Sequence, residues 1–427
     1  MAEDFEVSVR DAATKALAWG GEAFIEPLIE EGLSHADQDV RRRSVRALVA
    51  IGYPAIPALI DALGNSNASV REGAAIALGE IGSPIATRSL IATMGAAEED
   101  VRIAAREALV KIGRPTVPLL VKALEDSSYL IRWGAAEALG DIGDPSAVSA
   151  LIARLKMGKQ ENRLVRIAAA YALGKLGRRE ALEPLMGAIE EPDKDLREAA
   201  AVSLGLLKDP RAVEVVARHL YDPEEAVQEQ AAEALGRIGG SRAVELALQA
   251  LSHTHPKPRE YAALALGRLG DPRAVPALAA RLQDAEPSVR RRAAWALGET
   301  RSPEAVPFLL RALKDSDWRV AYAAIDGLAR MGSMAVEPLL RTFQGGDVLL
   351  ASYARKALAK MSPPPLEALR KVVEEGEGEA RLFAALALSE TGSDEAVEIL
   401  RRLARAEQDA RLRWVAQRAL YRMGRGW

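Results

Sequence analysis

The sequence predicts an all-α fold, a right-handed superhelix of paired α-helices of the kind called an α-solenoid. A unit of about 31 residues recurs along all 427 residues, and each unit holds two apolar patterns with helical spacing. Neither helix of a unit can bury its apolar face alone, so the units must stack on one another. We therefore expect a single repeat domain over residues 1–427.

The repeat is clearest around residues 227–290, where VQEQAAEALGRIGG is followed by PREYAALALGRLGD. We call the residue that opens the AA-x-AL segment the anchor, and it is usually arginine. Successive anchors lie 30 to 34 residues apart, which leaves no room for a separate catalytic domain. The anchors are Arg10, Arg41, Arg71, Arg102, Arg132, Arg166, Arg197, Gln228, Arg259, Arg290, Ala321, Ala351, Arg381 and Arg413.

Each unit predicts two helices. The first runs through the anchor, and its apolar residues recur on one helical face. The second follows a turn such as Asp271-Pro272 and has Pro276 in its first turn, where a missing N–H is harmless. A half unit at residues 1–20 and thirteen full units predict about 27 helices. In one unit the apolar face of the first helix consists of Val289, Ala293, Ala296 and Leu297.

The two helices of a unit differ in side-chain size. The AA-x-ALG helices present Ala and Gly, whereas the others present Leu, Val and Ile. Small side chains let neighbouring helices approach closely, so we expect the Ala-rich set to line the shorter, concave side.

Composition excludes several classes of protein. Lys plus Arg (57) nearly balance Asp plus Glu (60), so no overall field of one sign attracts nucleic acid or a membrane. The chain has no Cys, which excludes disulfides and thiolate chemistry. The N-terminus is acidic, and no stretch has the roughly 18 apolar residues of a membrane span. We expect a cytoplasmic protein.

The unit resembles the HEAT repeat, in the short form found in phycobilisome (PBS) lyase HEAT-like repeat proteins. The resemblance covers the whole chain. It implies a ladder in which a turn acid and the anchor arginine link adjacent repeats, with Asn65, Glu191, Glu375 and Glu407 as substitute turn residues. The ladder residues that the resemblance assigns are Asp126, Arg132, Asp222, Asp284, Arg290 and Asp315.

Departures from the repeat predict joints. Ala321 and Ala351 replace the anchor arginine, Gly345 replaces the turn acid, and three prolines at 363–365 follow. We expect a seam or a change of curvature near 343–365. The longest interval contains KMGKQENR at 156–163, which predicts a protruding turn and a candidate partner contact, with a solvated loop as the alternative.

No motif for catalysis is present. The sequence lacks G-x-x-x-x-G-K-[ST], H-E-x-x-H and G-x-S-x-G. Deoxyhypusine hydroxylase, an enzyme of similar repeats, binds iron through His-Glu pairs, and this chain has none. His253 and His255 could hold a metal only weakly, and a plain turn is the alternative. We predict no catalytic residue, metal or cofactor, although the lyase resemblance implies handling of a bilin.

Aromatic residues gather on the helical positions one, two and five residues after the anchor. These positions, which we expect to face solvent on the concave side, hold eight of the 19 aromatic residues. Exposed rings in a row favour a partner-binding groove; rings tucked between neighbouring helices are the alternative. The predicted groove residues are Trp133, Tyr171, Tyr261, Arg291, Arg292, Trp295, Tyr322, Arg330, Tyr353, Lys356, Phe383 and Trp414.

The inner positions are mildly basic from Val227 onward, whereas a separate basic cluster, Arg41 to Arg43 with Arg46, lies near the N-terminus. Arginine beside rings is typical of protein interfaces. The leading hypothesis is a non-catalytic scaffold that binds an acidic or amphipathic protein segment in its groove. A nucleic-acid-binding protein, for which Arg and rings also suit stacked bases, and a bilin-lyase-type enzyme or chaperone are the alternatives.

Overall fold

The computed structural model describes residues 21–424. Over that range the chain forms 26 α-helices and no strand. The half unit expected at residues 1–20 lies outside the described residues. The chain divides into two compact units, Met1–Asp209 and Pro210–Trp427. The all-α repeat fold predicted from the period is therefore confirmed.

The odd-numbered helices contain the anchors. They are α3 (Gln38–Ile51), α5 (Ala68–Ile81), α7 (Glu99–Ile112), α9 (Tyr129–Ile142), α11 (Arg163–Leu176) and α13 (Lys194–Leu207) in the first unit, and α15 (Glu225–Ile238), α17 (Pro256–Leu269), α19 (Pro287–Glu299), α21 (Trp318–Arg330), α23 (Val348–Lys360), α25 (Glu379–Thr391) and α27 (Ala410–Arg422) in the second.

Most even-numbered helices are shorter, and many are preceded by a single 3₁₀ turn. They are α2 (Ile25–Pro27), which continues as a π turn (Leu28–Gly32), α4 (Ile56–Ala62), α6 (Thr87–Thr93), α8 (Val117–Ala123), α10 (Val148–Lys156) and α12 (Leu182–Ala188), and then α14 (Val213–Arg218), α16 (Ser241–Ala250), α18 (Val275–Arg281), α20 (Val306–Ala312), α22 (Ser333–Thr342), α24 (Leu366–Glu375) and α26 (Asp394–Ala406).

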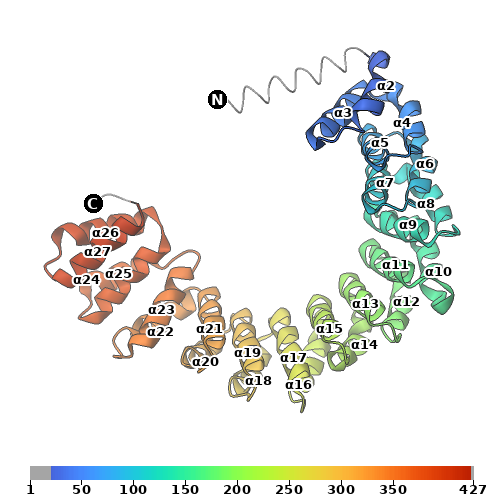
Figure 1. The fold of residues 1–427 in the computed structure, drawn as a ribbon. Helices are drawn as coiled ribbons and strands as arrows, with labels where there is room; N and C mark the ends of the chain where they lie inside the picture. Colours follow the sequence, from blue (N-terminus) through green and yellow to red (C-terminus); the bar gives the residue numbers. More distant parts are fainter. Residues whose placement is uncertain (1–20, 425–427) are drawn as a thin grey trace. The chain divides into compact units, whose positions relative to one another are not determined.

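Each unit is a stack of helix pairs. Within each unit the odd-numbered helices line the inner side of the curve and the even-numbered helices the outer side (Figure 1). The apolar face predicted for residues 289–297 is confirmed, because Val289, Ala293, Ala296 and Leu297 are fully buried. Pro276 lies in the first turn of α18, as expected.

Local signals explain where the odd-numbered helices begin. Four residues before the anchor, an Asp or Asn side chain often accepts a hydrogen bond from the second helical N–H, which caps the helix. Asp317 does so for α21, Asn67 for α5 and Asp409 for α27. This cap recurs from repeat to repeat, so it fixes where the odd-numbered helix of each repeat begins.

Glycine brings neighbouring odd-numbered helices into backbone contact. A Cβ placed on Gly298 of α19 would lie 2.3 Å from the Cα of Gly327 in α21. In the same way, a Cβ on Gly79 of α5 would lie 2.6 Å from the Cα of Ala108 in α7. Small residues therefore place the odd-numbered helices on the inner side within each unit.

The turn at 156–163 carries a buried, paired acid. Its Glu161 has a side chain only 1% exposed, which is paired with Arg132 at 2.7 Å and with Arg154 at 3.4 Å. The seam expected near 343–365 lies inside the second compact unit, and it stays a prediction.

Candidate functional site

Anchor arginines join each repeat to the next. In α19, Arg290 donates from Nη1 to the carbonyls of Asp284 and Ala285 in its own turn, at 3.0 and 3.2 Å. Its Nε and Nη2 donate to the carboxylate of Asp315 in the following turn, at 2.8 and 2.9 Å. We call such a pair of an anchor arginine and an acid of the following turn a rung. Arg259 makes an equivalent rung with Asp284, at 2.8 and 2.7 Å.

Other rungs use acids at less regular positions. Arg166 pairs with Glu191 and Arg381 with Glu407, both of which the sequence suggested as substitutes. The partner of Arg132 is Glu161, which sequence reasoning missed because the inserted turn shifts the acid by one position. Glu98, the partner of Arg71, was also missed, because it stands at the N-cap of α7 and not at the expected turn position.

The two remaining predicted acids, Asp126 and Asp222, each close the turn in front of an anchor through hydrogen bonds to its backbone. The carboxylate of Asp126 accepts the backbone N–H of Ser128 at 2.8 Å, whereas its carbonyl accepts Arg132 at 2.7 Å. The Asp222 carboxylate likewise accepts a hydrogen bond from the N–H of Glu224 at 3.0 Å. The backbone carbonyl of Asp222 accepts a hydrogen bond from Gln228 Nε2 at 2.6 Å. Gln228 thus reproduces half of what an anchor arginine does, the bond to its own turn.

Acid should weaken the rungs. Burial raises the pKa of Asp284, but the hydrogen bonds from Arg259 and from the N–H of Glu286, together with the charges of Arg259 and Arg281, outweigh burial, so the pKa lies below the ordinary 3.8. The pKa of Glu161, buried beside Arg132, is likewise lowered from 4.5. Because the unfolded chain then binds more protons, this stability is full above about pH 4.5 and is lost as the pH falls through the folded pKa values.

We therefore expect a melting temperature, followed by circular dichroism, that drops between about pH 4.5 and pH 3. The Asp284→Asn variant should start lower and depend less on pH in that window. A wild-type melting temperature that stays constant or rises from pH 4.5 to pH 3 would contradict this account.

The predicted groove residues fall in both compact units, and each unit is considered by itself. Trp133 and Tyr171 belong to the first unit, on α9 and α11, where both are half-buried. Burial raises the pKa of Tyr171, with a smaller contribution from Glu198. The other ten residues lie on α17 to α27, the part of the second unit whose inner side we call the inner surface.

Three predicted groove rings of the second unit pack against neighbouring helices. Tyr261 is only 4% exposed, and its hydroxyl donates to Glu225 at 2.7 Å. Burial, and then this hydrogen bond, raise the pKa of Tyr261. Phe383 stacks on buried Phe343, and Trp295 lies against Gly267 of α17. The prediction that Tyr261 is exposed in the groove is therefore wrong, because its ring fills the space between α15 and α17.

The exposed part of the inner surface centres on α21 and α23. Tyr322 is 37% exposed and meets Trp318 edge-on at 5.6 Å and Tyr353 at 6.5 Å between ring centres. Lys356 Nζ donates to the Tyr322 hydroxyl at 3.0 Å and lies 5.0 and 5.8 Å from the centres of the Tyr322 and Tyr353 rings. The hydrogen bond from Lys356 lowers the pKa of Tyr322. We call Trp318, Tyr322, Tyr353 and Lys356 the ring cluster.

Trp318 was not predicted, because it stands three residues before its anchor, at the start of α21. It is 64% exposed, and Val348 and Leu349, at the start of α23, are each 59% exposed. The signal in the sequence was a large apolar residue directly after a capping Asp, since Trp318 follows Asp317 and Val348 follows Asp347. Large apolar side chains exposed together are typical of an interaction surface.

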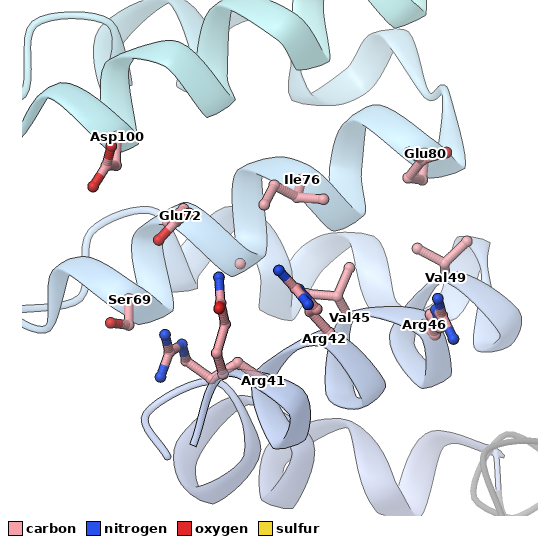
Figure 2. A pocket seen from close by; sticks show the side chains of 12 residues that line it. Arg41, Arg42, Val45, Arg46, Val49, Ser69, Glu72, Ile76, Glu80 and Asp100 are labelled. Atoms are coloured by element: carbon pink, nitrogen blue, oxygen red, sulfur yellow. The ribbon is translucent and has the colours of Figure 1, made fainter. Parts of the chain in front are cut away.

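A cavity in the first unit lies where the N-terminal basic cluster was predicted. It has a volume of about 630 Å³ between α3 and α5, with Arg42 and Arg46 on one wall and Glu72 and Glu80 on the other (Figure 2). Val45 and Val49 stand where α5 has Ala75 and Gly79. These larger side chains hold α3 and α5 apart, and the walls carry charges of both signs.

The described residues offer no metal centre. Between residues 21 and 424, no group of three or more His, Asp or Glu side chains is arranged to hold a metal ion. His253 lies 5.1 Å from Tyr221 and 5.5 Å from His255 between ring centres, and His253 Nδ1 accepts the N–H of His255 at 3.1 Å. The two histidines thus lie in a turn that this hydrogen bond closes.

No single helix among the described residues is long and apolar enough to cross a membrane. One bent pair, Gln38–Ile51 with Tyr53–Ala62, meets the length and composition criteria across an angle of 113°.

A family model described as HEAT repeats matches six overlapping segments of the chain, which are residues 25–110, 87–161, 156–227, 217–288, 276–352 and 336–421. The chain belongs to the HEAT-repeat family. The match is to HEAT repeats in general, and the finer PBS lyase-like assignment stays an expectation.

Known HEAT-repeat structures share the fold of this HEAT-repeat chain. The karyopherin Kap121p bound to the SUMO protease Ulp1p is similar with a TM-score of 0.53 and 14% identity, covering 92% of this chain and 51% of Kap121p. Kap121p bound to Nup53p gives 0.51 and 14%, covering 90% and 51%. The chain thus spans about half the length of these structures, and the likeness shows the fold alone.

A relative in sequence is the uncharacterized protein SkfG of Bacillus subtilis (strain 168). It is 28% identical over 151 residues, which is 34% of this chain and 87% of SkfG. This likeness names no activity.

Proposed function

We propose that this HEAT-repeat protein is a non-catalytic scaffold that binds a segment of a partner protein along the inner surface of its second unit. The observation that carries the proposal is the ring cluster, in which three rings and Lys356 meet at a partly exposed site. Rings beside a cation, with apolar neighbours exposed, are the composition of protein-interface hot spots. Trp414, 55% exposed beside Arg418, supplies a second such contact on α27.

The charges of the inner surface support a protein partner over nucleic acid. Arg330 pairs with Glu299 at 3.2 Å and Arg291 lies 3.6 Å from Glu260. Cations that already pair with carboxylates offer little net attraction to a phosphate backbone, which carries a charge at every nucleotide. The structures of Kap121p bound to Ulp1p and Nup53p are consistent with partner binding by this fold, although they show it for Kap121p only.

Removing two rings of the ring cluster should strongly reduce partner capture. We expect the tagged double variant Tyr322→Ala/Tyr353→Ala to recover at most about a tenth of the main partner recovered by the wild type from a lysate of the source organism. Tyr53→Ala removes a 69% exposed ring from a turn in the first unit and serves as the matched control. Equal recovery by the double variant and by the wild type would reject the proposed surface.

Three finer predictions accompany this proposal. Trp133 and Tyr171 would form a separate contact on the first unit. A cytoplasmic location would show in fractionation of the source cells. Bilin handling, which the PBS lyase-like resemblance implies, would show as visible absorbance retained by the protein after incubation with a free bilin and gel filtration.

A further inference from the structure

The carboxylates of the inner surface are already neutralised. Between residues 256 and 424, the inner positions one, two, five and nine residues after the anchors hold four carboxylates. Each lies within 4 Å of a cation. The pairs are Glu260 with Arg291 at 3.6 Å, Glu299 with Arg330 at 3.2 Å, Asp326 with Lys360 at 2.7 Å and Glu390 with Arg355 at 2.7 Å.

Three cations of the inner surface instead lie over aromatic rings. The Arg292 guanidinium carbon lies 5.7 Å from the Trp295 ring centre, Lys356 Nζ lies 5.0 Å from that of Tyr322, and the Arg418 guanidinium carbon lies 4.8 Å from that of Trp414. Within the part of the chain that the structure describes, none of the three is within ion-pair distance of a carboxylate. Each therefore leaves a positive charge beside an apolar ring face.

The fold sets the spacing of these three cation–ring sites. The three cations lie on α19, α23 and α27, and the Tyr322 ring lies on α21 beside Lys356, so one odd-numbered helix separates each cation from the next. Packed helix axes are about 8–10 Å apart, which puts successive sites about 16–20 Å apart. An extended chain covers that distance with about five or six residues, at roughly 3.3 Å per residue. A helix would need about 11 to 13 residues and could not follow the curved inner side.

From this charge pattern and spacing we infer that the partner segment is extended and acidic, with a carboxylate at about every sixth residue and an apolar residue beside each carboxylate. Each carboxylate would pair with one of the three cations, and its apolar neighbour would pack on the adjacent ring. This inference rests on the proposed function and adds the chemistry of the partner. Single-stranded nucleic acid carries a phosphate at every nucleotide. Some of these phosphates would lie beside the paired carboxylates between the three cations, where no unpaired cation is available to them.

Designed peptides test the spacing on the full chain. The first is a fluorescein-labelled 20-residue peptide with Glu-Leu at every sixth position in a Ser/Gly background. The second has the same composition with its Glu-Leu pairs contiguous, and the third has Gln for Glu. Fluorescence anisotropy at about 150 mM salt should show the spaced peptide binding at least about tenfold tighter than the other two. Each ion pair at an exposed cation contributes little, but the spaced peptide can form three of them at once.

Variants assign the contacts. Lys356→Met and Arg418→Gln should each weaken binding of the spaced peptide about two- to fivefold, which is the size of a single rim ion pair. Lys371→Met, which removes a 71% exposed cation from outer helix α24, should change its affinity less than about twofold.

Failure of the inference is distinguishable from failure of the proposed function. Equal affinity for the spaced and contiguous peptides, or no binding of the spaced peptide, overturns the inferred partner chemistry. If the ring variants still lose their cellular partner, the proposed surface nevertheless stands. Tighter binding of a 20-nucleotide single-stranded DNA than of the spaced peptide at the same salt overturns the inference in favour of nucleic acid.

Discussion

Replacing Arg290 with methionine is expected to destabilise the second unit by about 2–4 kcal/mol, because it leaves a shielded carboxylate without its partner. Arg290 and Asp315 are only 13% and 11% exposed, and the arginine also donates to two turn carbonyls. Methionine replaces the aliphatic part of the side chain but has no guanidinium, so it removes all of these hydrogen bonds. The loss should appear as a lower urea midpoint and as faster amide exchange in α19 and α21.

A neighbouring ion pair provides the control. Arg319 pairs with Asp317 at 2.7 Å, but Arg319 is 55% exposed, so Arg319→Met should cost less than about 1 kcal/mol. The double variant Arg290→Met/Asp315→Asn should recover about 1 kcal/mol relative to Arg290→Met, because no charged carboxylate remains unpaired. Equal losses for Arg290→Met and Arg319→Met would show that the rung contributes nothing beyond a surface ion pair.

Adding one methyl group to Gly298 is expected to cost about 2 kcal/mol. Alanine is the better helix former by about 1 kcal/mol, so intrinsic propensity alone predicts a gain. The new Cβ would lie 2.3 Å from the Cα of Gly327, and two backbones cannot yield as a flexible side chain can. Overpacking of this kind typically costs 1–3 kcal/mol, so α19 and α21 must move apart.

The same substitution at an open glycine reverses the sign. Gly187 lies in α12, and no atom is within 4 Å of the position its Cβ would take. Gly187→Ala should therefore stabilise the protein by about 0.5 kcal/mol, as helix propensity predicts. Urea midpoints measured on both variants would test the account, and a stabilised Gly298→Ala variant would refute the close backbone contact.

The inner surface shows how far sequence reasoning reached. The period located the inner positions, and Tyr322 and Trp414, each one residue after its anchor, are exposed as expected. Tyr261, two residues after its anchor, is buried instead. The direction of a helical side chain depends on its position around the helix axis. The Tyr261 ring, one residue further along than Tyr322 and Trp414 relative to the anchor, points toward the preceding inner helix α15, where its hydroxyl bonds to Glu225.

The rungs show a second limit. The anchor arginines are evident from their spacing, but Glu98 and Glu161 are partners that lie 27 and 29 residues further on, beyond the regular interval of 25 seen for Arg259 and Arg290. A long arginine side chain reaches any carboxylate near the next turn, so the actual partner depends on how each turn folds.

By itself, the sequence determined the repeat, the pairing of helices, the capped starts of the odd-numbered helices and the small residues that place them inside. These properties are local or periodic, so a single chain displays them directly. Only the tertiary structure decided which rings stay exposed and which acids complete the rungs. It also decided which cations have no carboxylate partner and where α3 and α5 separate. All of these depend on side chains that lie about 30 residues apart in the chain and meet only when neighbouring repeats stack.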